Sequence, residues 1–307
     1  MILLFILILL IRLTKALESG NTLLELGFSC IRIKDKLICN MDIFNPDAVP
    51  PGKKAPSLFT LEGRVNDFST RALHAHDCHQ LLRINSGTTL LEEKTWQQPL
   101  FADMTAFIPK GLPHRSVVLG GPVRYQSMYF FPGRWNPGLK SIRIFDLSSL
   151  GRALFDRICH ARKRPGPEQI RRKCQDLLFT LLDDEINKTS SITRIPVPRE
   201  KDNLRLVAFI KDHFQEKLTL NDFSRVVNYS PRQVTRRFKA DVGMTLFEFL
   251  RLYRIFRAAV LLSTEKGPVA QTAFAVGYES LSCFYKDFKA IFSTAPKAFC
   301  KRHLSKG

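Results

Sequence analysis

The sequence has few cysteines for its length and lacks the spacings typical of a disulfide or zinc framework. Seven cysteines occur in 307 residues, and no two of them form a C-x-x-C pair. Because an odd number is spread over a long chain, we expect reduced thiols that mostly fill the core. The seven are Cys30, Cys39, Cys78, Cys159, Cys174, Cys283 and Cys300.

Long hydrophobic runs are also scarce. The apolar run from Met1 to Ile11 is shorter than the roughly 20 apolar residues that span a bilayer. No positive charge precedes it and no small-x-small cleavage site follows it, so it makes a poor signal peptide. We expect residues 1–43 to be an extension outside the fold, with translation starting later, for example at Met41. A membrane tether is the alternative.

Motifs for catalysis are missing. We find no nucleophile–histidine–acid set, no phosphate loop and no zinc-finger spacing, which favours a binding protein over an enzyme. The composition is that of a globular protein, with 45% hydrophobic and 24% charged residues. The formal net charge of +19 favours a polyanionic partner, nucleic acid before an anionic membrane surface.

Residues 44–146 are predicted to form a β-domain. Short β-prone runs such as HQLLRINSGTTLLEE and VRYQSMYFF alternate with turn signals, a pattern typical of a sandwich or barrel. Asn85-Ser86-Gly87 and Leu119-Gly120-Gly121-Pro122 are predicted to be hairpin or loop turns.

This region contains a set of histidines that could share a pocket. Alternate residues of a strand face one side, so His74 and His76 are expected to point the same way. With Gln80 and His114, their spacing resembles the two motifs of the cupin fold, a small β-barrel in which two His, a Glu and a third His hold a metal. Gln80 stands where that family has Glu and is a weaker ligand. The four residues are therefore predicted to line an effector pocket without metal, or alternatively to bind a divalent metal.

Residues 147–187 are predicted to form a helical hairpin. Leu147, Leu150, Leu154 and Ile158 recur at helical spacing, as do apolar residues after Pro167. The hairpin would cover the barrel, supply a dimer seam, or do both. Residues 188–202, polar and interrupted by two prolines, are predicted to be a semi-extended interdomain linker.

Residues 203–307 are predicted to form an all-α domain of short helices. Leu204, Val207, Ile210 and Phe214 are expected to form the apolar face of the first helix. A second helix would follow a cap at Thr219 or Asn221.

Ser230 is predicted to cap a third helix, with Pro231 at its first position and Val234 and Phe238 buried. Its other face carries long basic side chains, as a helix that contacts base edges and phosphates requires.

A similar unit recurs after a long helix over Leu246–Leu262. Val269, Ala273, Phe274 and Val276 are apolar, Gly277 makes the turn, and Ser280 caps a helix that buries Phe284, Phe288 and Ile291. The exposed face of this last helix offers candidate DNA contacts as well.

The span from about Leu204 to Arg302 resembles the DNA-binding domain of the AraC/XylS family of transcription regulators. The residues that carry the resemblance include SPRQVTRRFK from Ser230, AVGY from Ala275 and SCFYKDFK from Ser282. A cupin-like N-terminal barrel is the usual partner domain in that family. Thr272, Leu281 and Ser293 depart from its usual pattern.

The candidate DNA-binding residues follow from the exposed faces and this resemblance. They are Ser230, Arg232, Gln233, Thr235, Arg236 and Lys239 in the first unit and Leu281, Ser282, Tyr285, Lys286 and Lys289 in the second. A rigid connecting helix would place both units in successive major grooves roughly 34 Å apart. From Asp202 onward 18 lysines and arginines oppose 9 acidic residues, a net charge of +9, so binding should depend strongly on salt.

The sequence therefore predicts a two-domain α+β protein: a cupin-like β-barrel with a helical hairpin, then two helix-turn-helix units joined by a long helix. We expect a cytoplasmic, nucleoid-associated transcription regulator without a cofactor. Its expected partners are double-stranded DNA, a small-molecule effector, a second copy of the chain and, for an activator, RNA polymerase. The alternatives are a metal-dependent cupin enzyme and a non-specific architectural DNA binder.

Overall fold

The computed structural model describes most of the chain after residue 57 and two short strands before it. The described residues are 30–33, 36–39, 58–65, 72–131, 133–160, 167–187, 194–265 and 267–304. The hydrophobic run at Met1–Ile11 and the start candidate Met41 lie outside them.

The chain divides into two compact units, Met1–Pro56 and Ser57–Gly307. In the first unit, β1 (Cys30–Ile33) and β2 (Lys36–Cys39) pair as an antiparallel two-stranded sheet. The second unit contains a seven-stranded sheet and every helix among the described residues.

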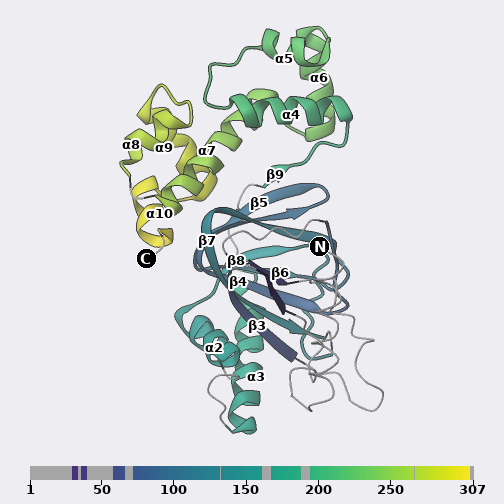
Figure 1. The fold of residues 1–307 in the computed structure, drawn as a ribbon, viewed down its shortest axis with the longest axis vertical. Helices are drawn as coiled ribbons and strands as arrows, with labels where there is room; N and C mark the ends of the chain where they lie inside the picture. The colour runs from purple at the N-terminus through teal and green to yellow at the C-terminus, as the bar shows by residue number, and fades with distance from the viewer. Residues whose placement is uncertain are drawn as a thin grey trace. The chain divides into compact units, whose positions relative to one another are not determined.

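The sheet of the second unit is antiparallel throughout (Figure 1). Its strands are β3 (Leu58–Val65), β4 (His79–Glu93), β5 (Trp96–Leu100), β6 (Met104–Ile108), β7 (His114–Phe130), β8 (Arg143–Asp146) and β9 (Ile195–Pro196). They pair in the order β3-β7-β4-β5-β9, and β6 pairs with both β4 and β8. The prediction of an α+β chain with strands first and helices last is confirmed, while the cupin assignment stays a prediction.

Two predicted turns are wrong. Asn85–Gly87 lies inside the single strand β4, and Leu119–Pro122 lies inside β7. The pairing of these strands shifts register at Ser86, so the turn-forming residues make β-bulges. Gly87 is required there because its φ is +81° and an added Cβ would lie 2.4 Å from the Pro122 carbonyl oxygen.

The segment predicted to be an interdomain linker is partly bound to the sheet, which the sequence did not predict. Ile195 is buried and pairs with Gln97 in β5. Beside it, the Arg194 guanidinium lies 4.0 Å from the Trp96 ring centroid and donates to the Ile142 carbonyl at 2.6 Å. This segment of the linker is therefore an ordered edge strand.

The helices α2 (Ser149–Cys159) and α3 (Glu168–Glu185) pack against each other, and α2 also packs on β3 and β7. Leu154 and Ile158 are buried as predicted, but Leu150 is 50% exposed. A buried arginine, Arg83, donates to Asp156 of α2 at 2.9 Å and so ties the sheet to the helix.

The C-terminal part is a series of helices around a phenylalanine-rich core. Phe223, Phe238, Phe249, Phe284 and Phe288 are fully buried. The helices are α4 (Lys201–His213), α5 (Leu220–Val227), α6 (Pro231–Val242), α7 (Leu246–Thr264), α8 (Val269–Ala275), α9 (Leu281–Phe292) and α10 (Pro296–His303).

Two apolar residues in these helices are not buried as predicted. Leu204 is 44% exposed, and Ile291 of α9 is only partly buried because it lies at the edge of the core. The buried face of α4 consists of Asn203, Leu206, Val207 and Ile210, so Leu206 occupies the core in place of Leu204.

No helix in the described part of the chain is both long and apolar enough to cross a bilayer. The five cysteines within that part that can be assessed, Cys78, Cys159, Cys174, Cys283 and Cys300, are free thiols.

Candidate nucleic-acid interface and histidine cluster

The first helix-turn-helix unit consists of α5 and α6, and both helices begin at capping boxes. Thr219 and Asp222 cap α5, and Ser230 and Gln233 cap α6. Asn228, with φ at +56°, ends α5 in the left-handed conformation. The two caps and this turn fix where α6 starts and which of its faces is exposed.

The helix α6 buries Val234 and Phe238 and exposes a basic face. Arg232, Arg236 and Lys239 are exposed, and no described residue forms a hydrogen bond or ion pair with their side chains. They are therefore available to a ligand.

Three other candidates on α6 already have partners within the helix. Ser230 and Gln233 bond to each other in the cap, and the Thr235 hydroxyl donates to the Pro231 carbonyl at 2.9 Å. Their role in placing α6 is clear from the structure, whereas contact with a ligand by their side chains stays a prediction.

The neighbouring Arg237 lies in a different environment. Its guanidinium forms an ion pair with Glu200 at 3.1 Å and lies 4.7 Å from the Tyr229 ring centroid. Tyr229 in turn donates to Asp202 at 2.8 Å. Arg237 therefore joins α6 to the start of α4, and the two adjacent arginines have separate roles.

The second unit consists of α8 and α9, with α9 capped by Ser280. Phe284 and Phe288 are buried, and the opposite side exposes Leu281, Ser282, Tyr285, Lys286 and Lys289. This face is less basic than that of α6, because Leu281 and Tyr285 are 36% and 42% exposed apolar or aromatic side chains.

The turn between α8 and α9 is held by the backbone before α5. Gly277 has φ at +88°, and an added Cβ would lie 2.6 Å from the Gln215 carbonyl oxygen. Arg254 of α7 donates to the carbonyls of Phe214 and Glu216 at 2.6 and 2.7 Å. Arg254 therefore connects α7 to the segment between α4 and α5, and so joins the two helix-turn-helix units.

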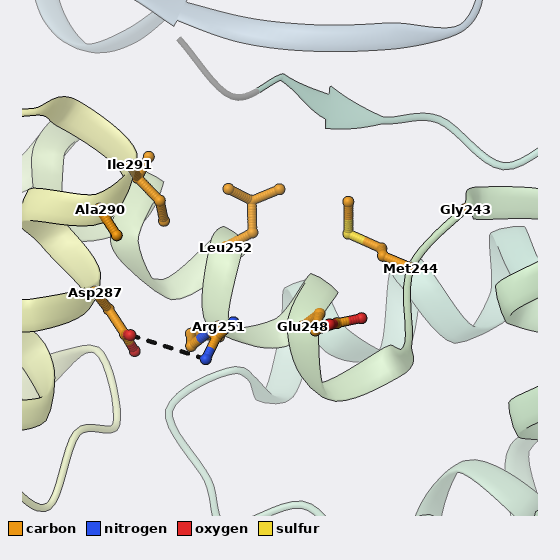
Figure 2. A pocket seen from close by; sticks show the side chains of 8 residues that line it. All are labelled: Gly243, Met244, Glu248, Arg251, Leu252, Asp287, Ala290 and Ile291. Carbon is orange, nitrogen blue, oxygen red and sulfur yellow. Dashed lines mark ion pairs between the residues drawn. The ribbon is translucent and has the colours of Figure 1, made fainter. Parts of the chain in front are cut away.

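A hollow of about 370 Å³ lies between the two helix-turn-helix units, where α7 meets α9 and the end of α6 (Figure 2). Met244, Leu252 and Ile291 form its apolar side. Arg251 and Asp287 face each other across it at 3.9 Å. Asp287 also accepts a hydrogen bond from Tyr278 at 2.8 Å, so it fixes α9 against both α7 and its own turn.

The histidines predicted from the sequence come together in the sheet unit. Nitrogen atoms of His74, His76 and His114 all lie within 4.8 Å of one another. The backbones of His74 and His114 form an isolated antiparallel bridge, which brings the two motifs side by side. The three side chains are arranged as a set that could hold a metal ion.

The chemistry of the cluster suits a neutral donor set. Burial lowers the pKa of His76 to about 4 and that of His114 to about 3, so both imidazoles are uncharged at neutral pH. His114 Nδ1 lies 2.9 Å from the Leu112 carbonyl. When Nδ1 donates to that carbonyl, Nε2 is left as the ligand atom, the usual arrangement of a metal-binding histidine.

Gln80 lies on the same side of the sheet and extends the polar cluster. Its Nε2 donates to Ser127 and Tyr129, each at 3.1 Å, while its buried Oε1 has no partner among the described residues. His76 Nε2 is likewise buried without a well-formed hydrogen bond to any of them, while the Gln80 side chain lies close enough to oppose part of the lowering of the His76 pKa. Buried polar atoms that lack a protein partner call for an explanation such as a water, an ion or a ligand.

Contacts of the sheet and its connections with helices α7 and α10 had no signal in the sequence. Phe101 packs on Phe299 and His303, with ring centroids 5.0 and 5.8 Å away. His303 Nδ1 lies 2.7 Å from the Ala102 carbonyl, and the buried hydroxyls of Thr88 and Ser263 lie 2.8 Å apart. These residues join α7 and α10 to strands β4 and β5.

Residues 223–302 match a family model described as a helix-turn-helix domain. The C-terminal part of the chain is thus a helix-turn-helix domain of the AraC type. The match covers α5 to α10, including both α6 and α9.

Curated relatives match over the same part of the chain. An uncharacterized HTH-type transcriptional regulator, YbfI of Bacillus subtilis, is 31% identical over 110 residues, which are 35% of this chain and 40% of YbfI. The transcriptional regulatory protein HptR of Staphylococcus aureus is 31% identical over 98 residues, 32% of this chain and 38% of HptR. The chain therefore spans about two fifths of the length of the relatives it matches.

Solved structures show a weaker likeness. ToxT from Vibrio cholerae is 13% identical with a TM-score of 0.34, over 80% of this chain and 98% of ToxT. The C-terminal domain of AraT, a response regulator from Geobacillus stearothermophilus, is 25% identical with a TM-score of 0.33, over 38% and 90% of the two chains.

Proposed function

We propose that this protein is a sequence-specific DNA-binding transcription regulator. The observation that carries the proposal is the exposed basic face of α6. The side chains of Arg232, Arg236 and Lys239 form no hydrogen bond or ion pair with a described residue, while the opposite face of the helix is buried. Exposed arginine and lysine side chains on a helix that follows a tight turn suit base edges and phosphates in a major groove. The relatives named as transcriptional regulators match over this domain.

The two units contribute unequally in this proposal. The first supplies Arg232 and Arg236 for base edges, with Ser230, Gln233 and Thr235 close to them. The second supplies Lys286 and Lys289 for phosphates, and Leu281 for an apolar contact such as a thymine methyl group. Ser282 and Tyr285 lie on the same face. The first unit therefore carries most of the specificity.

Binding to the DNA upstream of the protein's own gene tests the proposal. Fluorescence anisotropy should give a lower dissociation constant for that duplex than for a random duplex of equal length at moderate salt. Equal binding to both would favour the architectural alternative, a non-specific DNA binder.

The remaining partners are part of the same proposal. A small effector bound among His74, His76, Gln80 and His114 would alter the sheet, and the contacts of Phe101 and Thr88 would carry the change to the helices. The protein would act in the cytoplasm on the nucleoid, as a homodimer, and would contact RNA polymerase if it activates transcription. It would not be an enzyme.

The histidine cluster favours a second candidate, binding of a divalent transition metal, and with it a metal-dependent cupin enzyme. His74, His76 and His114 would hold the ion through imidazole nitrogens, and the Gln80 oxygen would add a neutral fourth ligand. An ion held there would supply Lewis-acid chemistry.

Metal analysis and calorimetric titration with Zn²⁺, Mn²⁺ and Fe²⁺ test this candidate. Stoichiometric metal that is lost in the His76→Ala variant would support it. The absence of binding by the intact chain would remove it and leave an organic effector.

A further inference from the structure

The hollow between the two helix-turn-helix units has an amphipathic lining. Its volume of about 370 Å³ is within the range of small-molecule pockets in proteins. Met244, Leu252 and Ile291 present a thioether and hydrocarbon surface on one side, and charged side chains lie on the other (Figure 2). A ligand that matches this lining therefore needs an apolar body and a charged head.

The charges of the lining are unequal in sign. Of the described residues that line the hollow, two are acidic, Glu248 and Asp287, and one, Arg251, is basic. Hydrogen bonds from the backbone and hydroxyl of Thr245 lower the pKa of Glu248, and the charges of Arg251 and Lys239 add to this, so Glu248 is ionised at neutral pH. The lining is therefore acidic, although the chain as a whole has a formal net charge of +19.

Two helices end at the hollow and add to its negative character. Gly243 is the C-cap of α6, and Ala290 and Ile291 belong to the last turn of α9. The carbonyl groups at a helix C-terminus carry a partial negative charge, which favours a cation. The N-terminus of α7 has the opposite polarity and offsets part of the Glu248 charge. Two C-termini against one N-terminus still favour a positively charged head.

Asp287 is the best placed partner for that head. Its side chain is only 17% exposed, and it accepts a hydrogen bond from the Tyr278 hydroxyl at 2.8 Å, which fixes its direction. The guanidinium of Arg251 lies 3.9 Å from its other oxygen, too far for a hydrogen bond. Because the Arg251 side chain is 56% exposed, it can turn toward solvent while an amine binds beside Asp287.

We propose that the hollow is a binding site for a small amphipathic amine, separate from the histidine cluster. The ammonium group binds Asp287 and Glu248. The hydrocarbon body packs on Met244, Leu252 and Ile291. A ligand in this place holds α7 against α9 and the end of α6, and so sets the spacing of the two helix-turn-helix units. The binding itself goes beyond the proposed function and is measurable without DNA.

Hexylamine is the probe for this site, with hexanoate and hexanol as controls. The three molecules share one hydrocarbon chain and differ in the charge of the head. A saturation-transfer NMR titration of the full-length chain at neutral pH should give hexylamine a dissociation constant at least about tenfold below those of both controls. Non-specific binding to so basic a chain would favour hexanoate instead. Equal binding of all three, or no binding of hexylamine, would overturn the proposal.

A filling variant tests the location. Ala290→Leu places a larger side chain in the hollow from an exposed position of α9 and should abolish hexylamine binding. Ala208→Leu makes the same change at an exposed position of α4 outside the hollow and should leave binding intact. Both positions are exposed, so the helical circular dichroism of the two variants should equal that of the wild type. Binding that survives Ala290→Leu would place the amine elsewhere and refute the site.

A pair of double variants tests the role of the carboxylates. Glu248→Gln/Asp287→Asn removes both charges, while glutamine preserves a capping box and asparagine keeps an acceptor for Tyr278. Hexylamine affinity should fall at least about tenfold, to the level of hexanol. The control Glu216→Gln/Glu279→Gln removes the same net charge at exposed positions outside the hollow and should change affinity less than about twofold. Equal losses in the two double variants would contradict binding by the hollow's carboxylates.

The outcome is separable from that of the DNA-binding proposal. A wild type that binds hexylamine but prefers no DNA would refute the proposed function and leave the site standing. Where a preferred duplex is bound, saturating hexylamine should change its affinity in the wild type and not in Ala290→Leu. An unchanged affinity in the wild type would contradict the influence of the ligand on the spacing of the two units.

Discussion

Two adjacent arginines on α6 allow the assignment of its DNA-reading face to be tested with one matched pair of variants. Arg236 is exposed and has no partner among the described residues. Arg237 pairs with Glu200 and lies over Tyr229. Replacing either by alanine removes the same charge from the same helix. Any difference in outcome therefore reports the direction of the side chain rather than the net charge of the domain.

For Arg236→Ala we expect affinity for the preferred duplex to fall by about 1–3 kcal/mol, the range for one lost base-reading arginine. This is ~5- to 150-fold in the dissociation constant. Affinity for a random duplex should change much less, so that specificity declines. The unfolding midpoint should stay the same, because no contact within the protein is lost.

For Arg237→Ala the expected pattern is reversed. The midpoint of thermal unfolding should fall, because α6 loses its connection to α4. Affinity for the preferred and random duplexes should fall together and modestly, since only a general positive charge is removed. Anisotropy titrations at two salt concentrations, with thermal unfolding of each variant, measure all of these quantities.

Two results would refute the assignment. One is an equal loss of affinity by Arg236→Ala on preferred and random DNA, which would make Arg236 a phosphate contact. The other is a greater loss of specificity from Arg237→Ala than from Arg236→Ala, which would mean that the opposite side of α6 faces the groove.

Three further predictions concern stability. Phe101→Ala should lower the free energy of unfolding by about 3–5 kcal/mol, because it empties a fully buried site between the sheet and α10. Chemical denaturation measures this loss, and an unchanged free energy of unfolding would contradict the packing of Phe101 on Phe299. Burial lowers the pKa of His303, and Arg302 adds to this while Asp146 and Asp103 oppose it. The unfolded chain therefore binds this proton first as pH falls through about 6.5, and stability declines on acidification. His303→Gln should show a smaller decline in denaturation midpoint, and parallel pH profiles would contradict this. Gly277→Ala should destabilise by more than about 1 kcal/mol, since φ is +88° and the Gln215 carbonyl leaves no room for a Cβ; an unchanged midpoint would show that the turn relaxes.

The features that sequence reasoning predicted well are local ones. Ser230 and Ser280 cap helices as expected, and Val234, Phe238, Phe284 and Phe288 are buried as expected. Each cap and each buried position depends on neighbours within about one or two helical turns, so the local sequence pattern is enough to predict it. The approach of His74 to His114 was implied by the resemblance of their spacing to the two cupin motifs.

The features that were missed depend on residues distant in the chain. Asn85–Gly87 has the composition of a hairpin turn, and only its pairing with β7 makes it a bulge. The sequence around Ile195 is typical of a linker, and only its pairing with β5 makes it a strand. In the sequence, Arg254 and Arg237 resemble exposed basic residues. In the structure, Arg254 donates to the carbonyls of Phe214 and Glu216 after α4, and Arg237 lies over the Tyr229 ring between α5 and α6. No pattern in the sequence predicts the contact of Phe101 with Phe299.

The most direct test of the central claim is to map the binding sites of the intact protein across its own genome. Sequence-specific regulation through α6 and α9 predicts a limited number of enriched sites upstream of genes that share one motif, and the Arg236→Ala variant should lose them. Uniform occupancy without a shared motif, unchanged in that variant, would contradict the claim.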